Sequence, residues 1–293
     1  MSAHIDSVPP SATRHTRARR ARPISAVALA RRFPLTSFVF LACLFGWSFF
    51  IADFLTGGSG AENLPIGPFF AALVVVACQG RANLRRWGRQ VRSWRAPPRW
   101  HLLSVLAPLA IIVLIVSVNH AWGAPLPTSG QLAAWPQVPV NFLVMLVFVG
   151  IGEEAAWIAF AAPILLRRHS LLVAGALAAG IRIFWHLPMM LTGSLSWTLG
   201  LLGNAAFTMV TLLVLMASGG RWSLVAVWHA TLNAASGLFV FTMVTGADRA
   251  RLGLLLSLAY TVVAVVWYLA GGKNLRLRSG YAETGPRRPG CPA

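Results

Sequence analysis

The sequence contains few acidic residues: 7 of its 293 residues are Asp or Glu, against 25 Lys and Arg. Charged residues make up 11% of the chain, whereas soluble domains average about 25%. This scarcity excludes an ordinary soluble domain. Hydrophobic residues make up 57% of the chain, with 12 Trp and 16 Phe, which is typical of a protein in contact with lipid. The composition predicts an all-α protein that crosses the membrane several times.

Cysteines are also few and scattered. Cys43, Cys78 and Cys291 have no paired spacing, so the sequence predicts neither a disulfide framework nor a cysteine-type metal site. No cleavage site of the A-x-A type follows a short apolar core near the N-terminus, which argues against a secretory signal. No internal repeat is recognisable, so a transporter built from repeats gains no support.

Long apolar runs predict a bundle of about eight transmembrane helices. They cover residues 35–55, 64–79, 101–119, 139–165, 171–191, 197–217, 222–243 and 252–270. All basic residues except Arg182, Arg249 and Arg251 lie before the first run, after the last run, or in the loops that follow runs two, four and six. Because cytoplasmic loops carry an excess of Lys and Arg, we expect a cell-membrane protein with both termini in the cytoplasm.

Basic segments flank the predicted transmembrane domain, residues 35–270. Residues 1–34 are expected to form a disordered cytoplasmic N-terminus, and residues 271–293 a basic cytoplasmic tail. The basic residues behind the net charge of +18 lie where the positive-inside rule places them, so the charge reports on topology. We therefore expect membrane lipid and no nucleic acid as partner. The segment from Arg81 to Trp100 predicts a short interfacial helix ended by Pro97 and Pro98, although a loop that only sets the topology explains it equally.

Two acidic residues stand side by side inside an apolar run. Glu153 and Glu154 interrupt the run VNFLVMLVFVGIGEEAAWIAFAAPILL, residues 140–166. A charged side chain at the bilayer centre costs at least about 2.5–3.5 kcal/mol, so such residues are rare and usually functional. Neighbours on a helix point about 100° apart. The pair suits general-base work on water or, equally, a proton relay.

Further polar residues lie in later apolar runs. His186 is followed by Pro188, which predicts a helix break that frees backbone carbonyls, although a single histidine in an apolar stretch is more often a packing residue. His229 and Asn233 share one helix face, where Asn233 either fixes the tautomer of His229, binds a substrate carbonyl, or forms an interhelical clasp. A rise of about 1.5 Å per residue places Glu153, His186 and His229 at different depths.

In this order, on separate runs, the three patterns resemble the CPBP family of intramembrane proteases, which includes the CAAX prenyl endopeptidases. The family motifs Glu-Glu-x-x-x-Arg, Phe-x-x-x-His and His-x-x-x-Asn/Asp are similar to residues 153–158, 182–186 and 229–233. The resemblance covers a core of about residues 139–240. Two positions depart from it, because Ile158 stands in place of the motif arginine and Arg182 in place of the motif phenylalanine.

The resemblance implies an enzyme that hydrolyses a peptide bond of a membrane-associated or lipidated protein or peptide. Glu153 would act as general base on water, and Glu154 would structure the site or share the proton. His229 and Asn233 would stabilise the oxyanion, and His186 would orient the water or add a second donor. A divalent metal such as zinc, bound by Glu153, His186 and His229, is the other option, although the chain has no His-Glu-x-x-His motif.

The two departures have two interpretations. Arg182 and His186 lie four residues apart on one helix face, so Arg182 would supply the missing cation if its helix packs against the helix of Glu154. The other interpretation is degeneration into a non-catalytic scaffold or immunity protein of the same family. A proton-coupled transporter is the alternative from a different class, because buried carboxylates and histidines also build proton relays.

Overall fold

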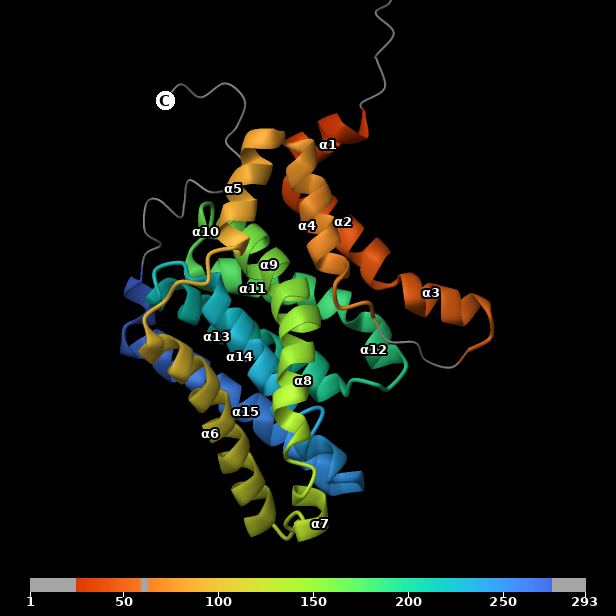
Figure 1. Ribbon diagram of the computed structural model, residues 1–293, viewed down its shortest axis with the longest axis vertical. Helices are drawn as coiled ribbons and strands as arrows, with labels where there is room; N and C mark the ends of the chain where they lie inside the picture. The colour runs from red at the N-terminus through yellow and green to blue at the C-terminus, as the bar shows by residue number, and fades with distance from the viewer. Residues whose placement is uncertain (1–24, 59–62, 276–293) are drawn as a thin grey trace, which may run out of the picture.

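The computed structural model describes residues 25–58 and 63–275, and this part of the chain consists of helices and turns without a strand (Figure 1). The all-α prediction is confirmed for it. Most of the predicted basic N-terminus (residues 1–24) and most of the predicted tail (residues 276–293) lie outside the described residues.

Five helical stretches are long and apolar enough to cross a membrane, as expected of a membrane protein. They are α6 (Pro98–Ala121), Gln137–Leu166, Leu199–Ala217, Trp222–Thr242 and α15 (Gly246–Ala270). A sixth span results if α1 (Ala26–Arg32) and α2 (Pro34–Gly46), which are bent by 119° relative to each other, count as one. The predicted count of eight is therefore not confirmed.

The remaining apolar runs form shorter helices because the chain breaks within or near them. The first predicted span breaks at Trp47 into α2 and α3 (Ser48–Leu55). The second forms only α4 (Gly67–Cys78), and the fifth breaks at His186 into α11 (Leu171–Trp185) and α12 (Leu187–Leu191). A helix of 15 residues is about 22 Å long, less than the roughly 30 Å of a bilayer's hydrocarbon core.

The arginine-rich segment does form a helix, α5 (Arg81–Val91). It follows α4 after a turn at Gly80, whose φ of +108° suits glycine. The predicted end at Pro97 and Pro98 is wrong, because α5 ends at Val91 and Pro98 instead begins α6. Proline is favoured in the first turn of a helix, where its missing N–H has no partner to lose.

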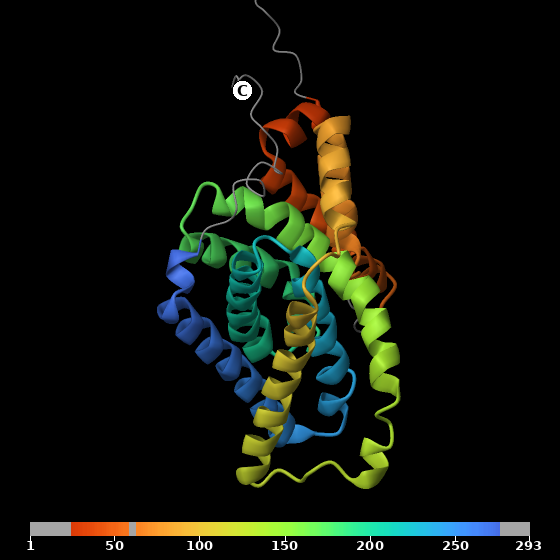
Figure 2. The same cartoon turned by 60° about the vertical axis from the view of Figure 1, so that its left-hand side comes forward.

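The centre of the bundle is formed by α13 (Asn204–Ala217) and α14 (Trp222–Ala235), with α6 and α15 packed outside them (Figures 1 and 2). In the apolar window of the stretch Trp222–Thr242, 67% of residues are buried, against 22% in α6. Outer helices such as α6 therefore expose apolar side chains on the outside of the bundle, as expected for helices that face lipid, and α14 carries residues into the interior. A short helix, α7 (Ser129–Leu132), lies in the connection that follows α6.

Candidate active site

Glu153 and Glu154 lie on a single turn of α-helix, α9 (Gly152–Ala156), within the span Gln137–Leu166. The span begins with α8 (Gln137–Met145) and ends with α10 (Ala162–Leu166). Two π-helical segments flank α9, namely η1 (Leu146–Ile151) and η2 (Trp157–Ala161). Such wide turns are rare and occur frequently at functional sites. Both glutamates therefore belong to an irregular part of an otherwise regular span.

Two glycines explain how this turn fits into the bundle. A Cβ at Gly150 would lie 2.9 Å from the carbonyl oxygen of Ala226 in α14, and a Cβ at Gly152 would lie 3.0 Å from the Cα of Ile66. Both distances are shorter than a side chain normally tolerates, so glycine is required for the close approach. The Gly-Ile-Gly sequence thus lets the glutamate turn pack directly against α14 and the turn before α4.

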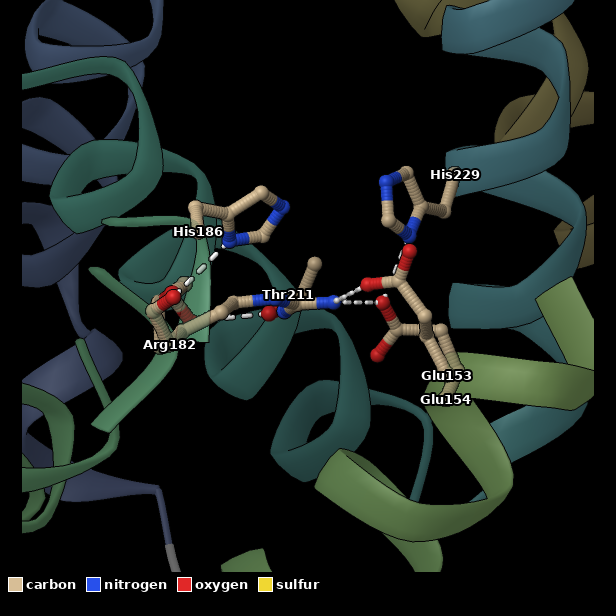
Figure 3. A network of polar contacts seen from close by, with 7 residues as sticks. Glu153, Glu154, Arg182, His186, Thr211 and His229 are labelled. Atoms are coloured by element: carbon tan, nitrogen blue, oxygen red, sulfur yellow. Dashed lines mark hydrogen bonds and ion pairs between the residues drawn. The ribbon is translucent and has the colours of Figure 1, made fainter. Parts of the chain in front are cut away.

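The two carboxylates share one buried cation, as Figure 3 shows. Nη2 of Arg182, from α11, lies 3.5 Å from Oε2 of Glu153 and forms an ion pair with Oε1 of Glu154. Nδ1 of His229, from α14, lies 2.6 Å from the same Glu154 oxygen. Glu154 is fully buried, and the exposed fractions of Arg182 and Glu153 are 1% and 5%. The contact that the exchange of positions between residues 158 and 182 requires is therefore present.

Two aromatic rings also contact the guanidinium group of Arg182. Its central carbon lies 5.2 Å from the ring centre of Phe207 and 5.9 Å from that of Trp157, which are cation–π distances. The sequence reasoning missed both residues. Trp157 could have been recognised from its position three residues after Glu154, one turn along the same span. Phe207 belongs to no motif, so nothing in the sequence marks it.

Three polar atoms of the cluster have no hydrogen-bond partner in the part of the chain that the structure describes. They are Nε and Nη1 of Arg182 and Oε2 of Glu154. An unsatisfied buried polar group costs about 1–3 kcal/mol. These atoms are therefore the positions in the cluster where a water molecule or a ligand would gain a hydrogen bond.

His186 lies at the break between α11 and α12, where its Nδ1 is 2.8 Å from the carbonyl oxygen of Arg182. A carbonyl can only accept, so Nδ1 carries the proton and Nε2 keeps its lone pair. The predicted break is confirmed, and the carbonyl of Trp185 accepts bonds from Trp47 Nε1 at 2.9 Å and Asn63 Nδ2 at 2.7 Å. Figure 3 shows the rings of His186 and His229 on the same side of the guanidinium group.

Asn233 lies one turn beyond His229 on α14 and is half-buried. No hydrogen bond joins its side chain to another of the described residues. Glu154 instead fixes His229: because an ionised carboxylate only accepts, Nδ1 of His229 carries the proton. The option that Asn233 fixes this tautomer is therefore wrong for this structure, and its side chain stays available for a ligand.

The cluster contains ligand types that metals use, but a cation already contacts them. Ligand atoms of Glu153, Glu154 and His229 lie within 4.8 Å of one another, and the bond from Nδ1 of His229 to Glu154 leaves Nε2 free as a ligand. His186 does not belong to this group. The guanidinium of Arg182 contacts both carboxylates and would repel a divalent ion. Zinc bound by Glu153, His186 and His229 would therefore require the guanidinium to move away from the carboxylates.

Comparisons with protein-family models, with curated proteins and with solved structures found no match. The resemblance to the CPBP proteases therefore rests on the motif residues alone.

Proposed function

We propose that the protein is an intramembrane peptidase of the CPBP type, which hydrolyses a peptide bond of a membrane-associated or lipidated protein or peptide. One observation carries the proposal: residues of three separate sequence patterns, on α9, α11 and α14, meet in one buried cluster. Packing alone would not bring the ionisable residues of all three patterns together, because each is expensive to bury.

Glu153 is the general base in this proposal. Among the described residues its carboxyl group has one polar contact, the 3.5 Å approach of Arg182, whereas Oε1 of Glu154 binds two donors. Glu153 takes a proton from water while the water oxygen bonds to the substrate carbonyl carbon. It then passes that proton to the amine nitrogen as the C–N bond breaks.

The other residues orient these groups and stabilise charge. Glu154 fixes Arg182 and His229, and an ionised Glu154 also stabilises the imidazolium form of His229. In that form Nε2 of His229 donates a hydrogen bond to the oxyanion, together with the side-chain amide of Asn233. His186 directs the lone pair of Nε2 at the water. No step in this scheme requires a metal.

We further propose that the bundle lies in the cell membrane with its basic end in the cytoplasm. Arg31 Nε donates to the carbonyl of Cys78 at 2.7 Å, and Trp222 Nε1 donates to that of Gln90 at 2.8 Å. These contacts join the end of α1 to that of α4, and the end of α5 to the start of α14. Each contact thus joins two segments that we assign to the cytoplasmic side, which supports the inferred topology.

The test is a cleavage assay with the purified protein reconstituted in lipid vesicles. A peptide library that includes prenylated peptides would be read by mass spectrometry for the wild type, for Glu153→Gln and for the matched control Asp248→Asn at the other end of the bundle. We expect cleavage by the wild type and the control, also with a chelator present, and none by Glu153→Gln.

Two results would contradict the proposal. Equal cleavage by Glu153→Gln and the wild type would show that Glu153 is not the general base. Loss of cleavage with a chelator, restored by zinc, would show that the reaction needs a metal. Proton-coupled transport that survives His229→Ala, without cleavage of any peptide, would favour the transporter.

A further inference from the structure

The helix α5 has two chemically different faces. Arg81, Arg85, Arg89 and Arg92 are exposed and follow each other at intervals of three or four residues, so they form one outward stripe. On the inward face, Trp87 is buried and its ring packs on Phe69, with centroids 5.4 Å apart. The stripe therefore faces the surroundings of the bundle.

This arginine stripe has no carboxylate to pair with among the described residues. These contain four acidic side chains, and Glu153 and Glu154 are buried around Arg182. Asp248 pairs with Arg251, and Asp53 lies on α3, far from α5 (Figure 1). Four neighbouring guanidinium groups repel one another, so the stripe is complementary to an external anionic surface.

The same helix is tied to the elements that carry the cluster. Trp87 Nε1 donates to the carbonyl of Ala155, the residue directly after Glu154, at 3.3 Å. At the other end of α5, the carbonyl of Gln90 accepts the bond from Trp222, the first residue of α14. A shift of α5 therefore pulls on the glutamate turn and on the helix of His229.

We propose that the arginine stripe of α5 binds anionic phospholipid headgroups of the surrounding leaflet, and that the bond from Trp87 to Ala155 couples this binding to the glutamate turn. Guanidinium groups bind phosphate in a bidentate manner, and basic amphipathic helices bind anionic membrane surfaces. Lipid binding holds α5 in the position in which the Ala155 carbonyl accepts the indole N–H. The coupling, unlike the lipid binding, rests on the proposed peptidase function.

Lipid binding is tested first, without reference to cleavage. Native mass spectrometry would count the phosphatidylglycerol molecules retained by the protein in competition with phosphatidylcholine. Each arginine near an anionic leaflet contributes about fivefold, so the preference of the triple variant Arg81→Gln, Arg85→Gln, Arg89→Gln should fall by about a hundredfold. The triple Arg→Lys variant keeps the charge but not the bidentate hydrogen bonds, so it should fall between the wild type and the glutamine variant, and Arg249→Gln should keep the preference. Undiminished preference in the glutamine variant would overturn the lipid site.

Coupling is tested by cleavage in vesicles with and without phosphatidylglycerol. We expect the wild type to be stimulated several-fold by the anionic lipid. Trp87→Phe keeps the packed ring but removes the N–H, so it should retain lipid and lose the stimulation. The control Trp94→Phe, whose ring packs on Trp222 with centroids 5.2 Å apart, should keep both.

The outcomes separate the two proposals. Stimulation that persists in Trp87→Phe, or wild-type cleavage that is the same in both lipids, would overturn the coupling and leave the lipid site standing. Loss of lipid binding in the glutamine variant, with no cleavage by the wild type in any lipid, would support the lipid site and count against the peptidase function.

Discussion

Two arginine–carboxylate clusters hold helices together in this bundle, and they differ in almost every other respect. Arg251 on α15 donates from Nε to Asn119 Oδ1 at 2.6 Å and from Nη2 to Asp248 Oδ1 at 2.7 Å, and so fastens α15 to α6. The side chains of Arg251 and Asp248 are 27% and 34% exposed. The cluster around Arg182 is buried, and two carboxylates share one nitrogen of the guanidinium group.

The difference shows what burial adds to the same chemistry. At the bundle's edge, water reaches the ion pair of Arg251 and Asp248, so this pair adds little to stability, although its partner Asn119 is buried. In the interior each charge is stabilised by its partners, so removal of one partner leaves the others buried without a compensating charge. The Arg182 cluster is therefore much more sensitive to substitution, which suits a site whose groups must keep fixed positions and charges.

The largest effect is expected for Arg182→Ala. It leaves two buried carboxylates without their cation, so the free energy of unfolding should fall by about 3–5 kcal/mol, and cleavage should be lost. Thermal unfolding in detergent and the vesicle assay would measure both. Ile158 is 2% exposed and lines the same small cavity as Arg182, so Arg182→Phe combined with Ile158→Arg should restore folding. A silent Arg182→Ala would disprove the exchange of positions.

The two glutamates should separate stability from activity. Glu154→Gln weakens charge-assisted hydrogen bonds to Arg182 and His229, each worth about 1.5–3 kcal/mol, so its melting temperature should fall clearly. Glu153→Gln should melt close to the wild type, yet lose about 10²–10⁴-fold in cleavage rate. If the two variants behaved alike in both measurements, the distinct roles assigned to the two carboxylates would be wrong.

A smaller and purely kinetic effect is expected for Asn233→Ala. The side chain makes no hydrogen bond to the described residues, so the melting temperature should not change. Loss of one oxyanion donor should lower the maximal cleavage rate by about 10²–10³-fold. Thr231→Ala is a matched control on the same helix, because Thr231 Oγ1 donates only to the carbonyl of Val227, and it should cleave normally.

The smallest effect on cleavage is expected for Arg251→Ala. A partly exposed ion pair contributes about 0–1 kcal/mol, and the buried Oδ1 of Asn119 would lose its donor at a cost of about 1–3 kcal/mol. Melting should therefore shift less than for Arg182→Ala, and cleavage should stay the same. A shift as large as that of Arg182→Ala would remove the contrast between the two clusters.

Much of this arrangement follows from sequence patterns. The scarcity of charge predicted a helical membrane protein, Pro188 predicted the break at His186, and the missing cation at position 158 suggested the contact of Arg182 with the glutamates. Each prediction rests on a local rule, either the cost of burying charge or the missing N–H of proline.

Relations between helices were not predictable in the same way. Depth counting separated Glu153, His186 and His229 because it assumed that all spans begin at one level. Trp222, the first residue of α14, is only 1% exposed, so this helix begins inside the bundle and His229 lies deeper than its position along α14 suggests. The cation–π contact of Phe207 likewise depends on how α11 and α13 pack, which no pattern within one helix reports.

The π-helical segments on either side of α9 have a consequence for how this span can vary. Each wide turn contains a residue that a regular α-helix would not need. Because the wide turn itself accommodates that extra residue, loss of one residue from η1 would turn it into a regular α-helical turn and leave α8 and the glutamates facing nearly as they do now. The same deletion within α8, a regular α-helix, would rotate the preceding part of the span by about 100° relative to the glutamates.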